Sequence, residues 1–202
     1  MKSKMYLYPI WVRLWHLVNA LLFLALIITG LSLQYSSNEY SLIAFEYSVS
    51  THNISGIILC IAFAFYIIAN RFTSNGNYYQ FHLKGLLGRV FKQFRYYAFG
   101  IFKNEDPPFP ISVGRKFNPL QKVSYVIVMY ILMPIMLVSG IALFFPEILP
   151  TKIIGVSGIH FFDLLHIITG YVLSIFMIVH IYFCTIGRTP FANFMSMING
   201  WH

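Results

Sequence analysis

The sequence predicts an all-α integral membrane protein built as a four-helix bundle. Of its 202 residues, 58% are hydrophobic and only 10% are charged. Soluble domains carry about 25% charged residues, so a water-soluble fold of this composition would lack a polar shell. Four segments also contain the roughly 20 largely apolar residues that a membrane-spanning helix requires. We therefore expect a single transmembrane domain over residues 1–202, surrounded by membrane lipid.

The four predicted spans cover residues 11–33, 52–70, 119–145 and 159–187, approximately. Between the second and third spans, residues 82–102 place leucine and phenylalanine among four basic residues at near-helical spacing: Lys84, Arg89, Lys92 and Arg95. This pattern is typical of an amphipathic helix that lies on a membrane surface. The sequence NEDPPFP that follows ends such a helix, because proline cannot continue it. No internal repeat is apparent from the residues alone.

The basic residues indicate how the bundle is oriented. Four spans place both termini on the same side of the membrane. Thirteen of the fourteen Lys and Arg residues then share that side, and only Lys152 falls in the opposite loops, 34–51 and 146–158. Because cytoplasmic loops carry such an excess, both termini are predicted to be cytoplasmic. The same distribution assigns the net charge of +8 to a membrane surface, and nucleic acid is not an expected partner.

Four of the seven histidines fall inside the predicted spans: His16, His52, His166 and His180. The topology places His16 and His180 near the cytoplasmic face, and His52 and His166 near the outer face. Residues 166 and 180 are separated by about 21 Å along a helix and point to nearly the same side. Neutral imidazole is an axial ligand of haem iron, and helix bundles bind cofactors between facing helices. We predict two bis-histidine haems, one held by His16 and His180 and the other by His52 and His166.

Neighbouring residues add to this prediction. The sequence has no CxxCH motif, so the haems would be non-covalent, b-type groups. Gly30, Gly56 and Gly170 would leave room for a porphyrin, although small residues also serve helix packing. Arg13 and Arg188 could pair with haem propionates, or could simply anchor the spans on the cytoplasmic side. The alternative for the four histidines is a set of hydrogen-bonded polar side chains or a proton relay.

Four segments carry a further signal: RLWHLVNALLFLALIITG (13–30), FRYYAFGIFKNEDPPFP (94–110), RKFNPLQK (115–122) and HIITGYVLSIFMIVHIY (166–182). They resemble the di-haem cytochrome b subunits of membrane-bound bacterial oxidoreductases. The sequence looks most similar to the thiosulfate reductase cytochrome b subunit, and less similar to formate dehydrogenase gamma subunits and nickel–iron hydrogenase cytochrome b subunits. The C-terminal TPFANFMSMINGW also resembles that family.

The resemblance implies that the same four histidines bind the haems. It also implies a quinone site near the cytoplasmic haem, where the third span begins. In formate dehydrogenase subunits, an asparagine at that place is followed two residues later by glycine. Here the asparagine is Asn118, but Leu120 replaces the glycine. Asn118 could contact the quinone, or could cap the helix that begins at Pro119.

We interpret the chain as a multi-pass electron-transfer subunit of the bacterial inner (cytoplasmic) membrane. Electrons would pass between an extracytoplasmic iron–sulfur or multihaem subunit and menaquinone or ubiquinone, as in quinone-linked respiratory oxidoreductases. One alternative is a stand-alone superoxide:quinone oxidoreductase, although the short outer loops, with Glu39, Glu46, Glu147 and one lysine, form no obvious funnel for an anion. A second alternative is a transporter or proton channel, which would contain no porphyrin.

Overall fold

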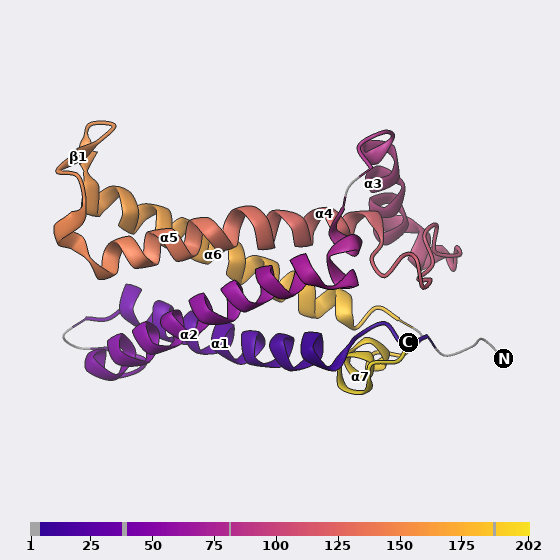
Figure 1. The fold of residues 1–202 in the computed structure, drawn as a ribbon, viewed down its shortest axis with the longest axis horizontal. Helices are drawn as coiled ribbons and strands as arrows, with labels where there is room; N and C mark the ends of the chain where they lie inside the picture. Colours follow the sequence, from indigo (N-terminus) through magenta and orange to yellow (C-terminus); the bar gives the residue numbers. More distant parts are fainter. Residues whose placement is uncertain (1–4, 38–39, 81, 188) are drawn as a thin grey trace.

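The computed structural model describes residues 5–37, 40–80, 82–187 and 189–202. Four helical stretches are long and apolar enough to cross a membrane: α1 (Ile10–Gln34), α2 (Phe45–Phe72), the stretch Pro119–Phe144 and α6 (Gly158–Cys184). They run along a common direction and form the expected all-α bundle (Figure 1). Each overlaps one predicted span. Helix α2 begins earlier than predicted because its first turns contain polar residues, which a search for an apolar span leaves out. Glu46 is one of them, and a carboxylate near a helix N-terminus is stabilising.

The third stretch is one helical path with a defect in its middle. It consists of α4 (Pro119–Ile127), the π-helical turn η4 (Val128–Leu132) and α5 (Met133–Phe144). Pro134, the second residue of α5, lacks an amide proton and crowds the carbonyl of Tyr130 one turn earlier. The π-turn accommodates the lost hydrogen bond by adding one residue to the helix.

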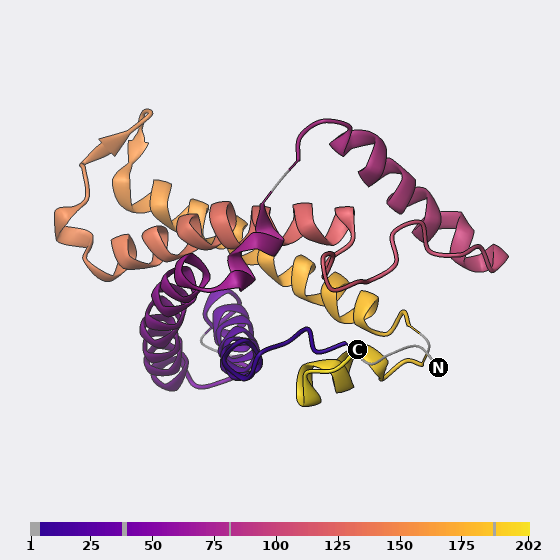
Figure 2. The ribbon, with the colours of Figure 1, turned by 45° about the vertical axis from the view of Figure 1, so that its right-hand side comes forward.

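The long helices form two pairs. Helix α1 packs along α2, and α5 with the preceding turn η4 packs along α6, whereas contacts between the pairs run mainly from α2 to α5. Figure 2 shows the α1–α2 pair (indigo to purple) beside the α5–α6 pair (orange to yellow) and at an angle to it. The buried core joins the pairs at mid-height and consists of Leu59, Val128, Met133 and Leu173. Because lipid tails are as apolar as leucine, close packing rather than escape from water holds such a core together.

Both ends of the described chain meet at one end of the bundle. The amide of Met5 donates to the carbonyl of His202 over 3.0 Å, and Tyr6 forms a β-bridge with Trp201. The short helix α7 (Ala192–Asn199) lies at this end, which we call the terminal end. The opposite loop end holds the α1–α2 connection, the turn η5 (Pro146–Ile148) and the hairpin of β1 (Lys152–Ile153) and β2 (Val156–Ser157).

The predicted amphipathic helix is present at the terminal end, with shifted limits. It comprises α3 (Leu86–Arg95), the π-turn η2 (Tyr96–Gly100) and η3 (Ile101–Lys103), and it follows η1 (Ser74–Tyr79) at the end of α2. It starts after Gly85, whose left-handed φ of 70° no continuous helix allows. Asn104, at a φ of 55°, ends it before the prolines. In Figure 1 this helix runs across the direction of the long helices, as a surface helix would.

Candidate functional site

The structure brings His16 and His180 together at the terminal end. His16 lies on α1 and His180 on α6, and their ring centres are 6.1 Å apart. The hydroxyl of Tyr125, on α4, is 3.5 Å from Nδ1 of His180, and Sγ of Cys184 is 3.7 Å from its Nε2. Phe176 stacks on the same imidazole, with ring centres 5.8 Å apart. These two histidines therefore face each other across the boundary between the α1–α2 pair and the α5–α6 pair.

His52 and His166 form the second pair, near the loop end. They lie on α2 and α6, with ring centres 6.2 Å apart. Each imidazole has a hydroxyl beside its Nδ1: that of Thr29 is 2.9 Å from His52, and that of Ser139 is 3.0 Å from His166. The pairing by depth that the sequence predicts is thus the pairing that the fold produces.

The spacing of both pairs fits an iron bound between two imidazoles. A nitrogen ligand lies about 2 Å from its metal ion, and the ring centre lies about 1 Å further, so two opposed imidazoles have centres about 6 Å apart. Within the described residues, no cluster of three or more His, Cys, Asp or Glu side chains could hold a metal ion. A bare ion usually needs more protein ligands than two. A haem iron does not, because the porphyrin fills its equatorial positions.

Glycines lie against the second pair, and the surroundings of the three predicted glycines differ. A Cβ on Gly30 would lie 3.4 Å from Cε1 of His52, so this glycine faces the imidazole itself. Its counterpart is Gly140, where a Cβ would lie 3.1 Å from Cε1 of His166; this glycine was not among the predicted ones. Gly170 instead faces Cε of Met136 at 3.3 Å, a helix-packing contact, whereas nothing lies within 4 Å of a Cβ on Gly56.

The two helix pairs repeat one local pattern that the sequence alone did not reveal. Ile-Thr-Gly-Leu at 28–31 on α1 corresponds to Val-Ser-Gly-Ile at 138–141 on α5. His-x-Ile-Ser-Gly at 52–56 on α2 corresponds to His-x-Ile-Thr-Gly at 166–170 on α6. The corresponding residues Leu59 and Leu173 both belong to the buried core. The second histidine pair therefore sits at the equivalent place of two similar hairpins.

Of the two arginines predicted to pair with haem propionates, the structure describes Arg13. Arg13 donates a hydrogen bond from its guanidinium to the carbonyl of Ile198, and so ties α1 to α7. Its Nε is buried without a hydrogen-bond partner among the described residues, one turn before His16. That unused donor suits an acidic group of a cofactor bound between His16 and His180. Arg188 lies outside the described residues.

Asn118 caps α4. Its side chain accepts from the amide of Gln121 over 2.9 Å, and Gln121 reaches back to the amide of Asn118, which completes a capping box. Its remaining donor, Nδ2, is directed to the hydroxyl of Tyr97 at 2.8 Å. Burial raises the pKa of Tyr97, and the bond from Asn118 opposes that shift. The capping interpretation of Asn118 is therefore confirmed, and Tyr97 is the side chain that Asn118 orients.

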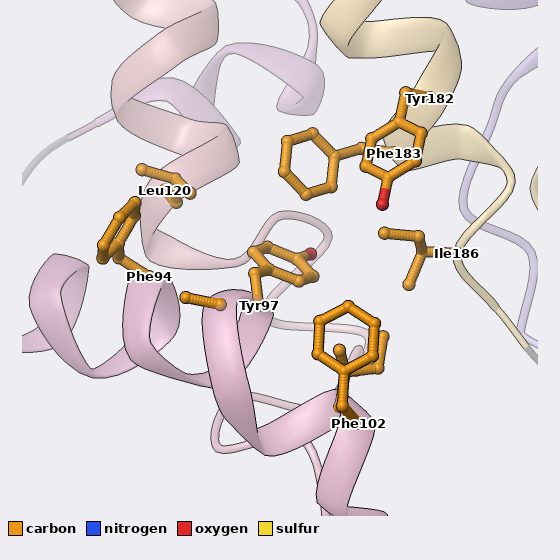
Figure 3. Close-up of a pocket in the computed structure, with 9 residues that line it drawn as sticks. Phe94, Tyr97, Phe102, Leu120, Tyr182, Phe183 and Ile186 are labelled. Atoms are coloured by element: carbon orange, nitrogen blue, oxygen red, sulfur yellow. The ribbon is translucent and has the colours of Figure 1, made fainter.

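Tyr97 lines a cavity of about 330 Å³ between the amphipathic helix and the terminal ends of α4 and α6. Its walls are apolar and aromatic: Phe94, Tyr97, Ala98, Ile101, Phe102, Leu120, Tyr182, Phe183 and Ile186. Figure 3 shows the rings of Tyr97, Phe102 and Tyr182 around this space, with the hydroxyl of Tyr182 directed into it. Tyr182 and Phe183 follow His180 on α6, so the cavity adjoins the first histidine pair.

Lys116 is the least expected residue of the terminal end. The charge pattern predicts that it lies with the basic residues of the membrane surface, but this lysine is only 2% exposed. Its Nζ donates to Oδ1 of Asn75 over 3.1 Å and lies over the ring of Tyr8, 4.5 Å from its centre. Burial lowers its pKa to about 8. Among the described residues, no carboxylate forms an ion pair with Lys116. The ion pair found there joins Arg95 and Glu105.

A membrane bundle that holds two histidine pairs, each spaced to bind one iron from both sides, has the architecture of a transmembrane cytochrome b. Comparison with known proteins gives the same class. Residues 7–200 match the family described as prokaryotic cytochrome b561. The chain is 37% identical over 203 residues to "Putative cytochrome YdhU" of Escherichia coli (strain K12), which covers 99% of this chain and 75% of that protein.

The chain therefore belongs to the prokaryotic cytochrome b561 family, and it is a multi-pass membrane cytochrome of the b type with an electron-transfer function. No solved structure is significantly similar to it. The predicted resemblance to membrane cytochrome b subunits is confirmed at this level. The thiosulfate reductase branch stays a prediction.

Proposed function

We propose that this cytochrome transfers electrons between an extracytoplasmic redox subunit and the membrane quinone pool through two b-type haems. The observation that carries the proposal is the presence of two histidine pairs at different levels of one bundle, with ring centres 6.1 and 6.2 Å apart. His16 and His180 would hold one haem, and His52 and His166 the other. Each bound haem supplies a one-electron iron couple.

The protein between the two pairs suits electron transfer rather than ion conduction. The two levels are separated by about 21 Å along α6. The core residues Leu59, Val128, Met133 and Leu173 lie between them, and none of the four has an ionisable side chain. This layer excludes water and ions, which would be expensive to bring to that depth. A transporter or proton channel would need a polar path at the same place.

The distribution of basic residues supports a cytoplasmic terminal end. Among the described residues, ten of the eleven Lys and Arg residues belong to that end, and Lys152 belongs to the loop end. The His16–His180 haem would then be the inner haem, and the His52–His166 haem the outer one. A reporter fused after His202 should be active in the cytoplasm of the bacterium, and activity on the other side would contradict this orientation.

The cavity beside Tyr97 supports a quinone site next to the inner haem. Its aromatic walls suit a flat apolar ring, and its position at the membrane surface suits a carrier that enters from the lipid. The hydroxyl of Tyr97 accepts a hydrogen bond from Asn118, so its own proton is available to donate to a quinone carbonyl. Asn118 does not line the cavity itself. Its contribution to the quinone site would be to orient Tyr97.

Haem content tests the core of the proposal. The purified chain should give two non-covalent haems per polypeptide in a pyridine haemochrome assay. A preparation without haem would favour the transporter alternative, and a single haem per polypeptide would contradict the two-site scheme. Copurification from native membranes tests the partner: a bound redox subunit is expected. Reduction of the isolated chain by superoxide, without any such subunit, would favour the superoxide:quinone oxidoreductase.

A further inference from the structure

Two buried hydroxyls hold the second histidine pair. Thr29 on α1 is 2% exposed, and Ser139 on α5 is fully buried. Their oxygens lie 2.9 Å from Nδ1 of His52 and 3.0 Å from Nδ1 of His166. They occupy equivalent places in the two similar hairpins, each followed directly by a glycine. One polar arrangement is thus built twice around one site.

The direction of these hydrogen bonds follows from the other partners of the hydroxyls. Thr29 donates to the carbonyl of Ala25 over 2.7 Å, and Ser139 donates to the carbonyl of Met136 over 3.0 Å. A hydroxyl has one proton to donate. Once that proton is used, the oxygen accepts from the imidazole, and Nδ1 of each histidine must carry its proton. In a neutral imidazole this leaves the lone pair on Nε2.

The glycines give each ring the space that this orientation needs. A side chain at position 30 or 140 would begin 3.4 Å from Cε1 of His52 or 3.1 Å from Cε1 of His166. Cε1 lies between the two ring nitrogens, so pressure there would turn the ring away from its hydroxyl. The hydroxyl and the adjacent glycine therefore act together on the same imidazole.

We propose that Thr29 and Ser139 are positioning residues for the outer haem: they fix the Nδ1–H form of His52 and His166 and present both Nε2 atoms to one iron. This inference rests on the proposed function, because it takes these histidines as the axial ligands. The first pair offers a contrast within the same chain. There the hydroxyl of Tyr125 is 3.5 Å from Nδ1 of His180, a longer and weaker contact.

The hydrogen bond has a measurable consequence for the iron. An imidazole that donates from Nδ1 is a more basic ligand, and it stabilises the oxidised iron more than the reduced one. Removing one such bond should raise the reduction potential of the outer haem. A lost neutral hydrogen bond corresponds to roughly a 2- to 13-fold change in the ratio of reduced to oxidised haem. At 59 mV per tenfold change, this is about 20–65 mV for a one-electron couple.

The test is a redox titration, followed by absorption, of the purified cytochrome with both haems bound. Thr29→Val and Ser139→Ala each remove one hydroxyl, and Thr29→Ser keeps it. Ser174→Ala is the matched control, because Ser174 on the same helix as His166 donates only to its own helix, to the carbonyl of Gly170 over 2.7 Å. His52→Ala identifies the outer haem by removing it.

Thr29→Val and Ser139→Ala should shift the same titration wave upward, the one that His52→Ala removes. Thr29→Ser and Ser174→Ala should leave both waves in place. Loss of the outer haem alone in Thr29→Val or Ser139→Ala would also support the inference, because a misdirected imidazole no longer binds. If Thr29→Val loses both haems, Thr29→Ala replaces it, and an unshifted outer wave there overturns the inference. A shift of the other wave, or an equal shift in Ser174→Ala, would overturn it as well. If His52→Ala removed no haem, the proposed function itself would fail.

Discussion

The imidazoles of His16 and His180 face each other from different helix pairs, with their ring centres 6.1 Å apart. Helices α1 and α6 belong to separate pairs, and close helix packing occurs mainly within each pair. A ligand bound between these two imidazoles would therefore join the α1–α2 pair to the α5–α6 pair. The stability of the assembled bundle and the retention of haem should be linked at this site.

This relationship predicts which histidine substitutions act alike. His16→Ala and His180→Ala should each remove the inner haem, whereas His52→Ala and His166→Ala should each remove the outer one. The reduced absorption spectrum and the number of titration waves measure the result. His160→Ala is the control, because His160 is bonded to Ser157 at the start of α6 and should leave both haems bound. Identical losses from His16→Ala and His52→Ala would contradict the pairing.

A second prediction concerns the glycines beside the outer haem ligands. Gly140→Ala should disturb the outer haem more than Gly30→Ala, because the added Cβ would lie 3.1 Å from the ring of His166 but 3.4 Å from that of His52. The expected change is a weakened or shifted outer-haem band in the first variant and a smaller change in the second. Gly88→Ala on α3, where nothing lies within 4 Å of the new Cβ, is the control. Equal spectra for all three variants would show that the rings tolerate the added methyl.

The buried Lys116 gives a prediction about pH. Burial lowers its pKa from 10.5 to about 8, so between these values the unfolded chain binds a proton that the folded chain has released. Folding stability should therefore rise with pH across this window and should not change through this group below about pH 8. Its contact with the ring of Tyr8 favours the charged form and partly opposes the effect.

Lys116→Met removes this titration. The apparent unfolding temperature of the wild-type cytochrome, measured relative to Lys116→Met in the same detergent, should increase between about pH 8 and 10.5. Lys103→Met, which removes a lysine from η3, reports the general effect of losing one positive charge. A constant difference between the wild type and Lys116→Met across that window would show that burial does not destabilise the ammonium group.

Much of the fold was predictable because a membrane-spanning segment can be recognised from its local sequence. Length and apolar composition located the four long helices, and two depths sorted four histidines into the two pairs that the structure contains. Both arguments need only the helical rise and the order of the spans. The amphipathic segment was also predictable from its periodicity, although its limits depended on the backbone conformations of Gly85 and Asn104.

The remaining features depend on contacts between distant parts of the chain. The repeated hairpin pattern was hidden because Thr29 and His52 are 23 residues apart, whereas Ser139 and His166 are 27 apart. Threonine and serine in a span ordinarily bond to their own helix, so nothing in the residue pattern directs them to histidines. Lys116 is counted with the surface cations until the fold encloses it beside Asn75. Asn118 is correctly located, but its partner Tyr97 lies 21 residues away in the chain.

The last prediction separates the capping role of Asn118 from its role in the quinone site. Asn118→Ser keeps a helix-capping oxygen but loses the bond to Tyr97, and Asn118→Leu loses both. Loss of the cap should cost about 0.5–2 kcal/mol of stability, so only Asn118→Leu should lower the unfolding temperature. Tyr97→Phe removes the hydroxyl without touching the cap. All three variants should retain both haems and be reduced fully by dithionite.

Quinol kinetics then locate the site. Each of the three variants should slow haem reduction by a short-chain quinol, because the donor to the quinone carbonyl is lost or misdirected. One lost hydrogen bond corresponds to roughly a 2- to 13-fold effect. Because burial raises the pKa of Tyr97, its phenol stays protonated at and above neutral pH, and the slowing should not depend on pH there. Slowing in Asn118→Leu alone would make the effect one of helix stability. Unchanged kinetics in Tyr97→Phe would remove this hydroxyl from the site and leave that of Tyr182, which also faces the cavity, as the donor to examine.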